Sequence, residues 1–530
     1  MIQTNNKLTK WSIIPSVKID KIWYEWVWVS TYTDGRKVIV SWWVLPWTVA
    51  DLKVVQLKKD WIKCHVHQVI KMDDSMITSK KICPHYLYHP QASETPQHKR
   101  NCGGCKRQIM DYDNQLKLKK QIVEDSFRHN SNKDINILDT LGSPDIFGYR
   151  NKIEYSFGKY ITWKKENLQR LSERSVGFHK QGDFGKIVDI DICLLVDEKV
   201  NRVFTYMKKL LSNYRYEDNQ NLPVYDQITH KWVLRHMLIR QGKNTDQIMV
   251  ILSLSDKQIS QDELRKLKQT LSQDQILKSS IDTFVMIYNN WLADIVSWPE
   301  SIIENLWWDG TISEVLDIRN NGRSNQLSFD ISPKSFFQTN THWCELLYNT
   351  AIKITKDRLD DKYAQENNKW LIVDLYCGAG TIGISLLSAW VGDRLIGIEE
   401  VPSAIQDAEN NIANNDIKWA DFFVWKVEKL ISINDIDKYK NKIQIWDKIF
   451  DTSLLKLIIV DPPRSWLHPD VVSFLDNLKK NIDFTLLYIS CNPTTLSRDL
   501  DMFTNFERNT IQPVDMFPHT YHIENIVLMR

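Results

Sequence analysis

Cys491 is a residue whose type and position suit covalent chemistry. It follows an apolar run, residues 485–490, that predicts a buried strand. An earlier apolar run, residues 455–460, ends in Asp461, so both side chains are expected at the carboxyl edge of one sheet. Most free cysteines are buried and inert, but a thiol at such an edge can be a nucleophile. The position of Cys491 therefore favours a catalytic role.

Residues 369–389 predict a strand, a tight turn and a helix around which the rest of the chain is organised. An apolar run ends at Asp374, and a helical pattern of apolar residues resumes after the glycines. Gly378 and Gly380 let the backbone come close to a ligand at the N-terminus of that helix. Open α/β sheets bind nucleotide-like ligands at this edge, so we expect a ligand with a ribose here.

Two cofactor classes fit this turn. Gly378, Gly380 and Gly383 match the dinucleotide-binding pattern, which by itself is a weak signal for NAD. Asp374 favours S-adenosylmethionine, because an acid stabilises a cationic ligand and no pyrophosphate has to be bound. Glu399 ends the next predicted strand, where it would bind the ribose hydroxyls of either cofactor. On these residues alone both cofactors stay open.

Five motifs, in order along the chain, together resemble the RNA 5-methyluridine methyltransferase family. They are Asp374-Leu-Tyr-Cys-Gly-Ala-Gly, Asp461-Pro-Pro-Arg, Ser490-Cys-Asn-Pro, Asp515-Met-Phe-Pro-His-Thr and His522-Ile-Glu524. Five motifs in the right order are far more specific than any one of them. The resemblance implies S-adenosylmethionine as the cofactor. It also implies that Gln338, Tyr376, Glu399 and Asp461 contact the methyl donor, beside the turn glycines Gly378 and Gly380.

The chemistry of uracil explains why such an enzyme needs a thiol. Carbon 5 of the ring is a poor nucleophile, but addition of a thiolate to C6 makes it enolate-like and able to attack the methyl group. The resemblance assigns the thiolate to Cys491, and it makes Glu524 the candidate base that removes the C5 proton. Cys377 lies early in the glycine turn and is expected to be structural. A target inside folded RNA must be unpaired or flipped out.

Four cysteines outside this region predict a metal site. Cys102 and Cys105 form a C-x-x-C turn between glycines, and Cys83 and Cys193 supply two more thiols. From the spacing alone, zinc and an iron–sulfur cluster are equally compatible. The resemblance favours a [4Fe–4S] cluster, since one branch of the family uses four cysteines in this order. That branch has a shorter gap between its first two ligands, so Cys83 departs from its pattern.

The composition predicts a multidomain globular protein. The chain has 530 residues, 43% of them hydrophobic and 25% charged. Its formal net charge of +2 is too small to indicate nucleic-acid binding by itself. Alternating apolar residues predict a β-barrel over 10–72, which the resemblance makes an OB-like TRAM domain. We expect a central α+β domain with the cysteine cluster over 80–330. Residues 331–530 are expected to form an α/β, Rossmann-like methyltransferase domain, with 357–369 as a linker.

RNA is the expected partner, and the resemblance favours 23S ribosomal RNA over transfer RNA. The lack of a signal sequence and of a long apolar run predicts a cytoplasmic protein without a membrane segment, and we expect a monomer. The alternatives are a transfer RNA uracil-C5 methyltransferase, an amino-directed base methyltransferase that needs no thiol, and a non-catalytic RNA-binding factor. Loss of activity in Cys491→Ala separates the first of these from the second.

The balance of glycine and tryptophan is unusual. The chain has 17 glycines, against about 37 expected from ordinary composition, and it has 21 tryptophans. Several tryptophans stand where turn chemistry favours glycine, as in Ser41-Trp-Trp-Val-Leu-Pro-Trp47, Leu306-Trp-Trp-Asp-Gly310 and Ser465-Trp466-Leu467. We hypothesise that a stop codon read as glycine has been translated as tryptophan. The alternative is a protein that is truly rich in tryptophan.

Overall fold

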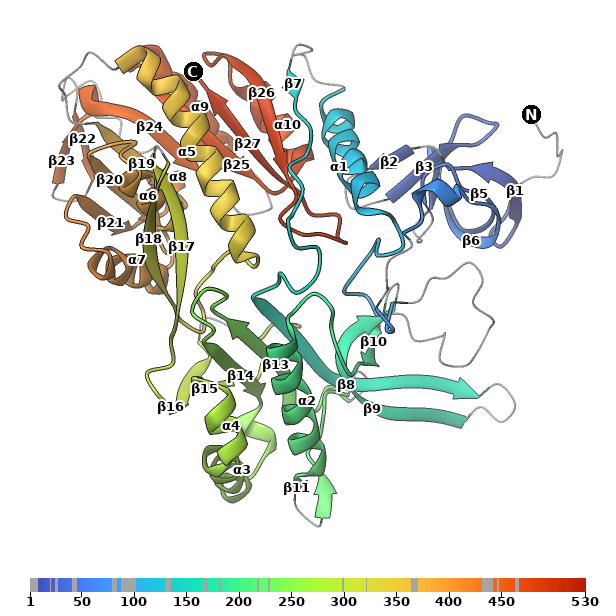
Figure 1. Ribbon diagram of the computed structural model, residues 1–530. Coiled ribbons are helices and arrows are strands. Elements are labelled where there is room, and N and C mark those ends of the chain that lie inside the picture. Colours follow the sequence, from blue (N-terminus) through green and yellow to red (C-terminus); the bar gives the residue numbers. More distant parts are fainter. Residues whose placement is uncertain are drawn as a thin grey trace.

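The computed structural model has three groups of strands, and helix α1 lies between the N-terminal strands and the C-terminal domain (Figure 1). The structure describes residues 8–530 except 20, 24–26, 41–44, 79–82, 87–101, 129–134, 165–168, 181–182, 217–218, 227–228, 298–299, 321, 364–369, 431–441, 446–447 and 463–466. Among the described residues, no helix has both the length and the apolar character that a bilayer crossing requires.

The N-terminal strands form one six-stranded sheet with the order β1-β5-β6-β4-β3-β2. Residues of β5 alternate between the two faces of the sheet, so that Ala50, Leu52 and Val54 are buried. The strands are β1 (Ile13–Lys18), β2 (Lys21–Trp23), β3 (Val27–Thr31), β4 (Lys37–Val40), β5 (Val49–Leu57) and β6 (Trp61–Lys71).

Helix α1 (Tyr112–Phe127) joins this sheet to the C-terminal part of the chain. Asp111 caps it, because its side chain accepts a hydrogen bond from the backbone N–H of Asp113. Leu118 and Ile122 of α1 pack in the core of the N-terminal sheet, whereas Val123 and Phe127 pack in a core of the C-terminal domain. The helix therefore has two apolar faces, and each face contacts a different domain.

The central part of the chain forms a seven-stranded sheet with the order β10-β9-β8-β13-β14-β15-β16. The β8–β9 hairpin projects from this part of the molecule (Figure 1). The strands are β8 (Lys152–Lys164), β9 (Gln169–Lys180), β10 (Asp183–Asp189), β13 (Leu234–Gln241), β14 (Ile248–Leu254), β15 (Thr283–Tyr288) and β16 (Ile302–Trp307). The helices are α2 (Glu198–Asn213), α3 (Gln261–Gln273) and α4 (Gln275–Ser280), and β11 (Arg215–Tyr216) pairs with β12 (Gln220–Asn221).

The C-terminal domain is built on an eight-stranded mixed sheet with the order β21-β20-β19-β24-β25-β27-β26-β7. Its parallel strands are β19 (Leu371–Leu375), β20 (Arg394–Glu399), β21 (Ala420–Val424), β24 (Leu455–Val460) and β25 (Thr485–Ser490). The other strands are β26 (Arg508–Val514), β27 (Glu524–Met529) and β7 (Asn136–Ile137), a short strand contributed from far upstream in the chain. In the strand order, β20 and β24 lie on opposite sides of β19. The strand order therefore reverses direction at β19, and sheets of this kind bind ligands at such a switch point.

Helices cover this sheet. One two-stranded hairpin precedes it in the chain, and a second lies between β21 and β24. The helices are α5 (Thr341–Tyr363), α6 (Thr381–Ser388), α7 (Pro402–Asn414), α8 (Val427–Leu430), α9 (Pro469–Asn481) and α10 (Pro493–Met502). The hairpins are β17 (Ile312–Asn320) with β18 (Arg323–Ile331), and β22 (Lys442–Ile445) with β23 (Lys448–Asp451). The linker prediction for 357–369 was wrong in its first half, because α5 continues to Tyr363. Within this part of the helix, Leu359 is buried.

Candidate active site and cysteine-lined cavity

The glycine turn between β19 and α6 has the backbone conformation of a ligand-binding loop. Tyr376, Gly378 and Gly380 have φ angles of 62°, 53° and 76°, all in the left-handed region. A side chain at Gly380 would also clash, since its Cβ would lie 2.9 Å from the Phe422 ring. A tyrosine with positive φ stores strain, and such strain is concentrated at functional sites. The turn is therefore shaped for close approach of a ligand.

Two acids line this turn. The backbone N–H of Gly378 donates to Glu399 Oε2 at 3.3 Å, and Val401 donates to Glu399 Oε1 at 3.0 Å. Asp374 is 1% exposed, and its Oδ2 accepts a hydrogen bond from Gly383 at 3.0 Å. Burial raises the pKa of the Asp374 carboxyl to about 8. A cationic ligand beside this turn would stabilise both carboxylates.

Gln338 and Asp461 approach the same domain from different elements. Gln338 is buried just before α5, where its backbone oxygen accepts a hydrogen bond from Asn151 Nδ2 at 2.9 Å. Asp461 follows β24 and keeps some accessible surface, yet desolvation by the surrounding chain raises the pKa of its carboxyl to about 7. Arg464, which completes the Asp-Pro-Pro-Arg motif, lies outside the described residues.

Cys491 and Glu524 meet at one edge of the sheet. In the antiparallel β25–β27 pair, Ser490 lies opposite Asn525, so the next step of the register sets Cys491 opposite Glu524. A hydrogen bond of 3.1 Å from Asn525 Nδ2 to the Ser490 oxygen holds the ends of these strands together. Cys491 is partly exposed and Glu524 is 5% exposed. The strand register thus brings together a reachable thiol and a carboxyl that are far apart in the sequence.

The other thiol near the glycine turn is much less accessible. Cys377 is 8% exposed, and its thiol pKa is raised well above the ordinary value, chiefly by burial and then by the Asp374 charge. Cysteine reactivity requires the thiolate form, so this environment suits a structural residue.

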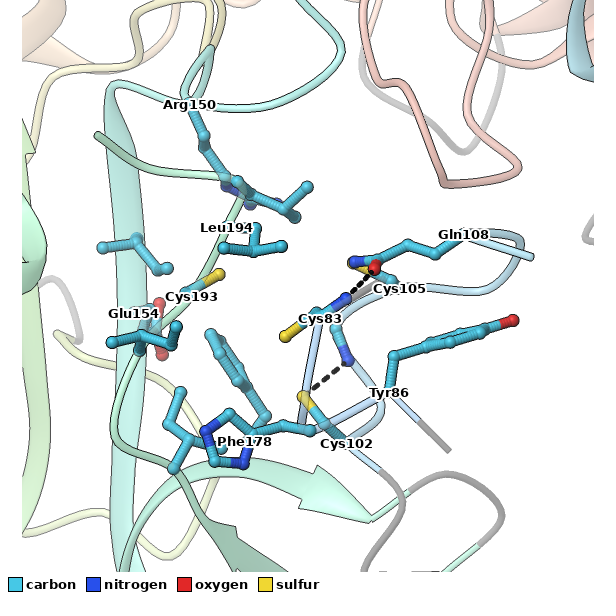
Figure 2. Close-up of a pocket in the computed structure, with 16 residues that line it drawn as sticks. Cys83, Tyr86, Cys102, Cys105, Gln108, Arg150, Glu154, Phe178, Cys193 and Leu194 are labelled. Atoms are coloured by element: carbon cyan, nitrogen blue, oxygen red, sulfur yellow. Dashed lines mark hydrogen bonds between the residues drawn. The ribbon is translucent and has the colours of Figure 1, made fainter. Parts of the chain in front are cut away.

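The remaining candidate cysteines converge on one cavity. Cys83, Cys102, Cys105 and Cys193 line a cavity of about 280 Å³ in the central part of the molecule. In Figure 2 the sulfurs of Cys83, Cys102 and Cys193 point into the space between two walls of the cavity. Within the described ranges, no group of three or more His, Cys, Asp or Glu side chains has the arrangement of a metal-ion site. The structure therefore brings the four thiols to one cavity without showing a metal cluster.

Gln108 is a cavity residue that the sequence did not single out. Its Nε2 donates to Cys105 Sγ at 3.0 Å, and its Oε1 accepts from the backbone N–H of Cys83 at 2.9 Å (Figure 2). Gly104 donates its backbone N–H to Cys102 Sγ at 3.5 Å. Donors of this kind stabilise thiolate sulfur, and Gln108 also links Cys83, the cysteine that departs from the family pattern, to Cys105 of the C-x-x-C turn.

Comparisons with known proteins place this site in a family. Residues 309–530 match the model of the tRNA (uracil-5-)-methyltransferase family. An uncharacterized RNA methyltransferase of Caldanaerobacter subterraneus subsp. tengcongensis is 31% identical over 524 residues, covering 97% of this chain and 98% of that protein. The chain belongs to the RNA uracil-C5 methyltransferase family. An uncharacterized RNA methyltransferase of Bacteroides thetaiotaomicron is a further relative, 30% identical over 92% of this chain and 95% of its own length.

The fold of this chain is also found in a solved structure. It is the Pyrococcus abyssi tRNA (uracil-54, C5)-methyltransferase in complex with S-adenosyl-L-homocysteine. The likeness has a TM-score of 0.64 at 23% identity and covers 97% of this chain and 100% of that chain. The family assignment makes the protein an RNA methyltransferase that uses S-adenosylmethionine, which excludes the NAD alternative at the glycine turn.

Proposed function

We propose that this methyltransferase forms 5-methyluridine in RNA through a covalent adduct between Cys491 and C6 of the target uracil. The observation that carries the proposal is the register of β25 and β27, which sets Cys491 opposite Glu524 at the edge where Asp461 follows β24. A nucleophile and a base on one face of a site are the two groups that this reaction needs.

The steps balance with these two residues. The Cys491 thiolate adds to C6, and the electron pair of the C5–C6 double bond makes C5 nucleophilic. C5 attacks the methyl group of S-adenosylmethionine, so the C–S bond of the sulfonium breaks and S-adenosylhomocysteine leaves. Glu524 then accepts the C5 proton, the C5–C6 double bond re-forms, and the thiolate departs from C6. No oxidant or reductant is needed.

Six residues are proposed to hold the methyl donor. The turn residues Gly378 and Gly380 bring the backbone close to the cofactor, and Glu399 accepts hydrogen bonds from the ribose hydroxyls. Asp461 lies between the cofactor edge and Cys491 along the strand order β19-β24-β25, so it also suits a contact with the uracil. Gln338 and Tyr376 complete the set.

The charge of Glu399 is expected to contribute to cofactor affinity. Glu399→Gln should raise the KM for S-adenosylmethionine about 10-fold or more with little change in kcat, because a charge-assisted hydrogen bond to bound cofactor is weakened. Isothermal titration with S-adenosylhomocysteine checks the binding directly. Glu400→Gln, one residue away and exposed, is the matched control. Unchanged affinity in Glu399→Gln would remove this residue from the cofactor set.

The four cysteines are proposed to hold a [4Fe–4S] cluster. They are brought to one cavity, and such a cluster needs more space between its four sulfur ligands than a single tetrahedral zinc ion. When bound, the cluster would supply a cationic centre that keeps four buried thiols deprotonated. We expect a brown protein with iron-dependent absorption after anaerobic purification, and loss of iron in Cys105→Ser. A colourless protein with one bound zinc would contradict the proposal.

For the substrate we propose 23S ribosomal RNA. The support is the resemblance of the sequence to one branch of the family. In that branch a TRAM domain, here residues 10–72, comes first. The central domain with the four cysteines (80–330) follows, and the methyltransferase domain (331–530) comes last. Transfer RNA is the second candidate, since the matched family model and the solved relative carry transfer RNA names. Incubation with labelled S-adenosylmethionine and each unmodified RNA, followed by nucleoside analysis, tests both. Label in 5-methyluridine from one RNA identifies the substrate, and label in an amino-methylated base would contradict the reaction.

A further inference from the structure

The segment that leads into Glu524 is attached to the cysteine-lined cavity. We call residues 515–523 the catalytic loop, because they end at the proposed base. Within this loop His519 is 2% exposed and has a left-handed φ of 65°. Its backbone oxygen accepts hydrogen bonds from the N–H groups of Lys106 at 2.8 Å and Arg107 at 3.2 Å. These two residues directly follow Cys105, so the strained residue is held by the chain that leaves the C-x-x-C turn.

Gln115 of α1 forms hydrogen bonds both to His519 and to the segment that follows Cys105. Its Oε1 accepts from the His519 backbone N–H at 3.0 Å, and its Nε2 lies 3.2 Å from His519 Nδ1. The same Nε2 donates to the backbone oxygens of Arg107 at 3.2 Å and Met110 at 2.9 Å. Gln115 is fully buried, so its amide joins the cysteine segment and the catalytic loop without competition from water.

Lys119, one helical turn further along α1, anchors both ends of the loop. Its Nζ forms a buried ion pair with Asp515 at 2.5 Å and donates to the backbone oxygens of Phe517 at 3.1 Å and His522 at 2.8 Å. Tyr112 donates to the other oxygen of Asp515 at 2.9 Å. A single helix therefore fixes the loop from its first residue to the residue two positions before Glu524.

We propose that Gln115 is a positioning residue that couples the four-cysteine cavity to the catalytic loop, so that loading of the cavity orders the segment carrying Glu524. The coupling rests on the proposed cluster in the cavity, and its effect on catalysis rests on the proposed role of Glu524. Removal of the bound centre frees the chain around Cys102 and Cys105, which loosens Lys106 and Arg107 and then His519. The segment that positions Glu524 is then less ordered, while Cys491, directly after β25, keeps its place because β25 makes none of these contacts.

The test compares Gln115→Leu with Gln121→Leu, the same change on the same helix. Gln115→Leu should increase amide hydrogen exchange in residues 515–523 at unchanged iron content, and wild-type protein stripped of iron should show the same increase. With ordinary RNA it should lower kcat about 10²-fold by misplacing the base, with the KM for S-adenosylmethionine unchanged, and should accumulate a methylated protein–RNA adduct on denaturing gels. Gln115→Glu, which keeps the acceptor for His519, should recover part of the exchange protection.

Equal exchange of residues 515–523 in loaded and stripped wild-type protein would overturn the coupling. That measurement needs neither a variant nor catalysis, so it stands even where Gln115→Leu fails to fold or Glu524 proves not to be the base. A fall in kcat without adduct accumulation in Gln115→Leu would also overturn it, provided that Glu524→Gln accumulates the adduct. Failure of Glu524→Gln itself to do so would count against the proposed function instead.

A second inference concerns the tryptophans, and it rests on backbone conformation. Among the described residues other than glycine, eleven have positive φ angles, and four of these are Trp11, Trp47, Trp308 and Trp390. Their side chains are 58%, 46%, 78% and 80% exposed. Bulky residues avoid this region of φ, whereas glycine enters it freely. The four positions therefore have a backbone conformation typical of glycine, and their side chains are much less buried than tryptophan usually is.

Trp390 shows the pattern most clearly. Helix α6 ends at Ser388 and Ala389 is its C-cap. Trp390 follows with φ of 62°, its N–H donates to the Leu387 oxygen at 3.0 Å, and the Val391 N–H donates to the Leu386 oxygen at 3.1 Å. These two hydrogen bonds make a complete Schellman motif, with the buried pair Val391 and Leu386 as its apolar contact. The left-handed position of this motif is usually glycine.

We infer that these four positions are glycine in the protein that the source cell makes. Peptide mass spectrometry of natively produced protein should find glycine at 11, 47, 308 and 390, and tryptophan at all four would overturn the inference. In recombinant protein made as written, Trp390→Gly should raise Tm by about 1–2 °C, because positive-φ strain is relieved. Trp343→Gly, which removes a side chain that is 3% exposed inside α5, should lower Tm and serves as the contrast.

Discussion

Replacement of Cys491 by alanine is expected to reduce methyl transfer to RNA on the order of 10⁴-fold or more, because C5 of uracil has no nucleophilic character without the C6 adduct. Binding of S-adenosylhomocysteine should be unchanged, since the glycine turn follows β19 and Glu399 ends β20, whereas Cys491 follows β25. Scintillation counting of labelled RNA measures the loss, and titration of cofactor confirms that the site remains intact.

Cys377→Ala is the matched control for this experiment. Cys377 is the other thiol beside the cofactor turn, and its burial predicts a role in packing, so its loss should leave turnover within a few-fold of wild type. Retained activity in Cys491→Ala would favour the amino-directed class of base methyltransferases, which needs no thiol. Loss of activity in both variants alike would argue for damage to the domain rather than for covalent catalysis.

The Glu524→Gln variant is expected to stop after methyl transfer. The C5 proton then has no acceptor, so turnover should fall about 10²- to 10⁴-fold while the methylated protein–RNA adduct accumulates. Denaturing gels with labelled RNA show the adduct as a band of reduced mobility. The double variant with Cys491→Ala should form none.

Glu507→Gln provides the comparison for Glu524→Gln. Glu507 is exposed on the same domain, and its backbone groups pair with Arg530. This variant should turn over normally and show no adduct. An equal loss of turnover in Glu524→Gln without any adduct would assign Glu524 an earlier role, before the methyl group is transferred.

The sequence predicted those site residues that lie directly at the ends of strands. Apolar runs that stop at Asp374, Glu399 and Asp461 predict strands with acids at one edge, and the structure has β19, β20 and β24 at those places. Parallel strands leave their carboxyl ends on one side of a sheet, so the order along the chain was sufficient to predict a common edge. The left-handed Tyr376, by contrast, had no signal in its residue type.

Contacts between distant segments had no comparable signal. Gln115 and Lys119 look like ordinary polar positions of a helix, yet both are fully buried and bond to residues about 400 positions away. Cys491 lies opposite Glu524 because of the antiparallel register of β25 and β27. Both strands are buried on both faces, so their residues do not alternate between apolar and polar, and the sequence does not specify that register. The helical end of α5 was missed because its last turns are polar.

The most direct measurement of the central claim is peptide and nucleotide mapping of the adduct that Glu524→Gln accumulates on ribosomal or transfer RNA in the presence of S-adenosylmethionine. Nuclease and protease digestion followed by tandem mass spectrometry should yield the peptide containing Cys491 joined to a nucleotide whose uracil carries one added methyl group. A methylated nucleotide attached to any other residue, or product RNA that carries its methyl group on an exocyclic nitrogen, would contradict the mechanism.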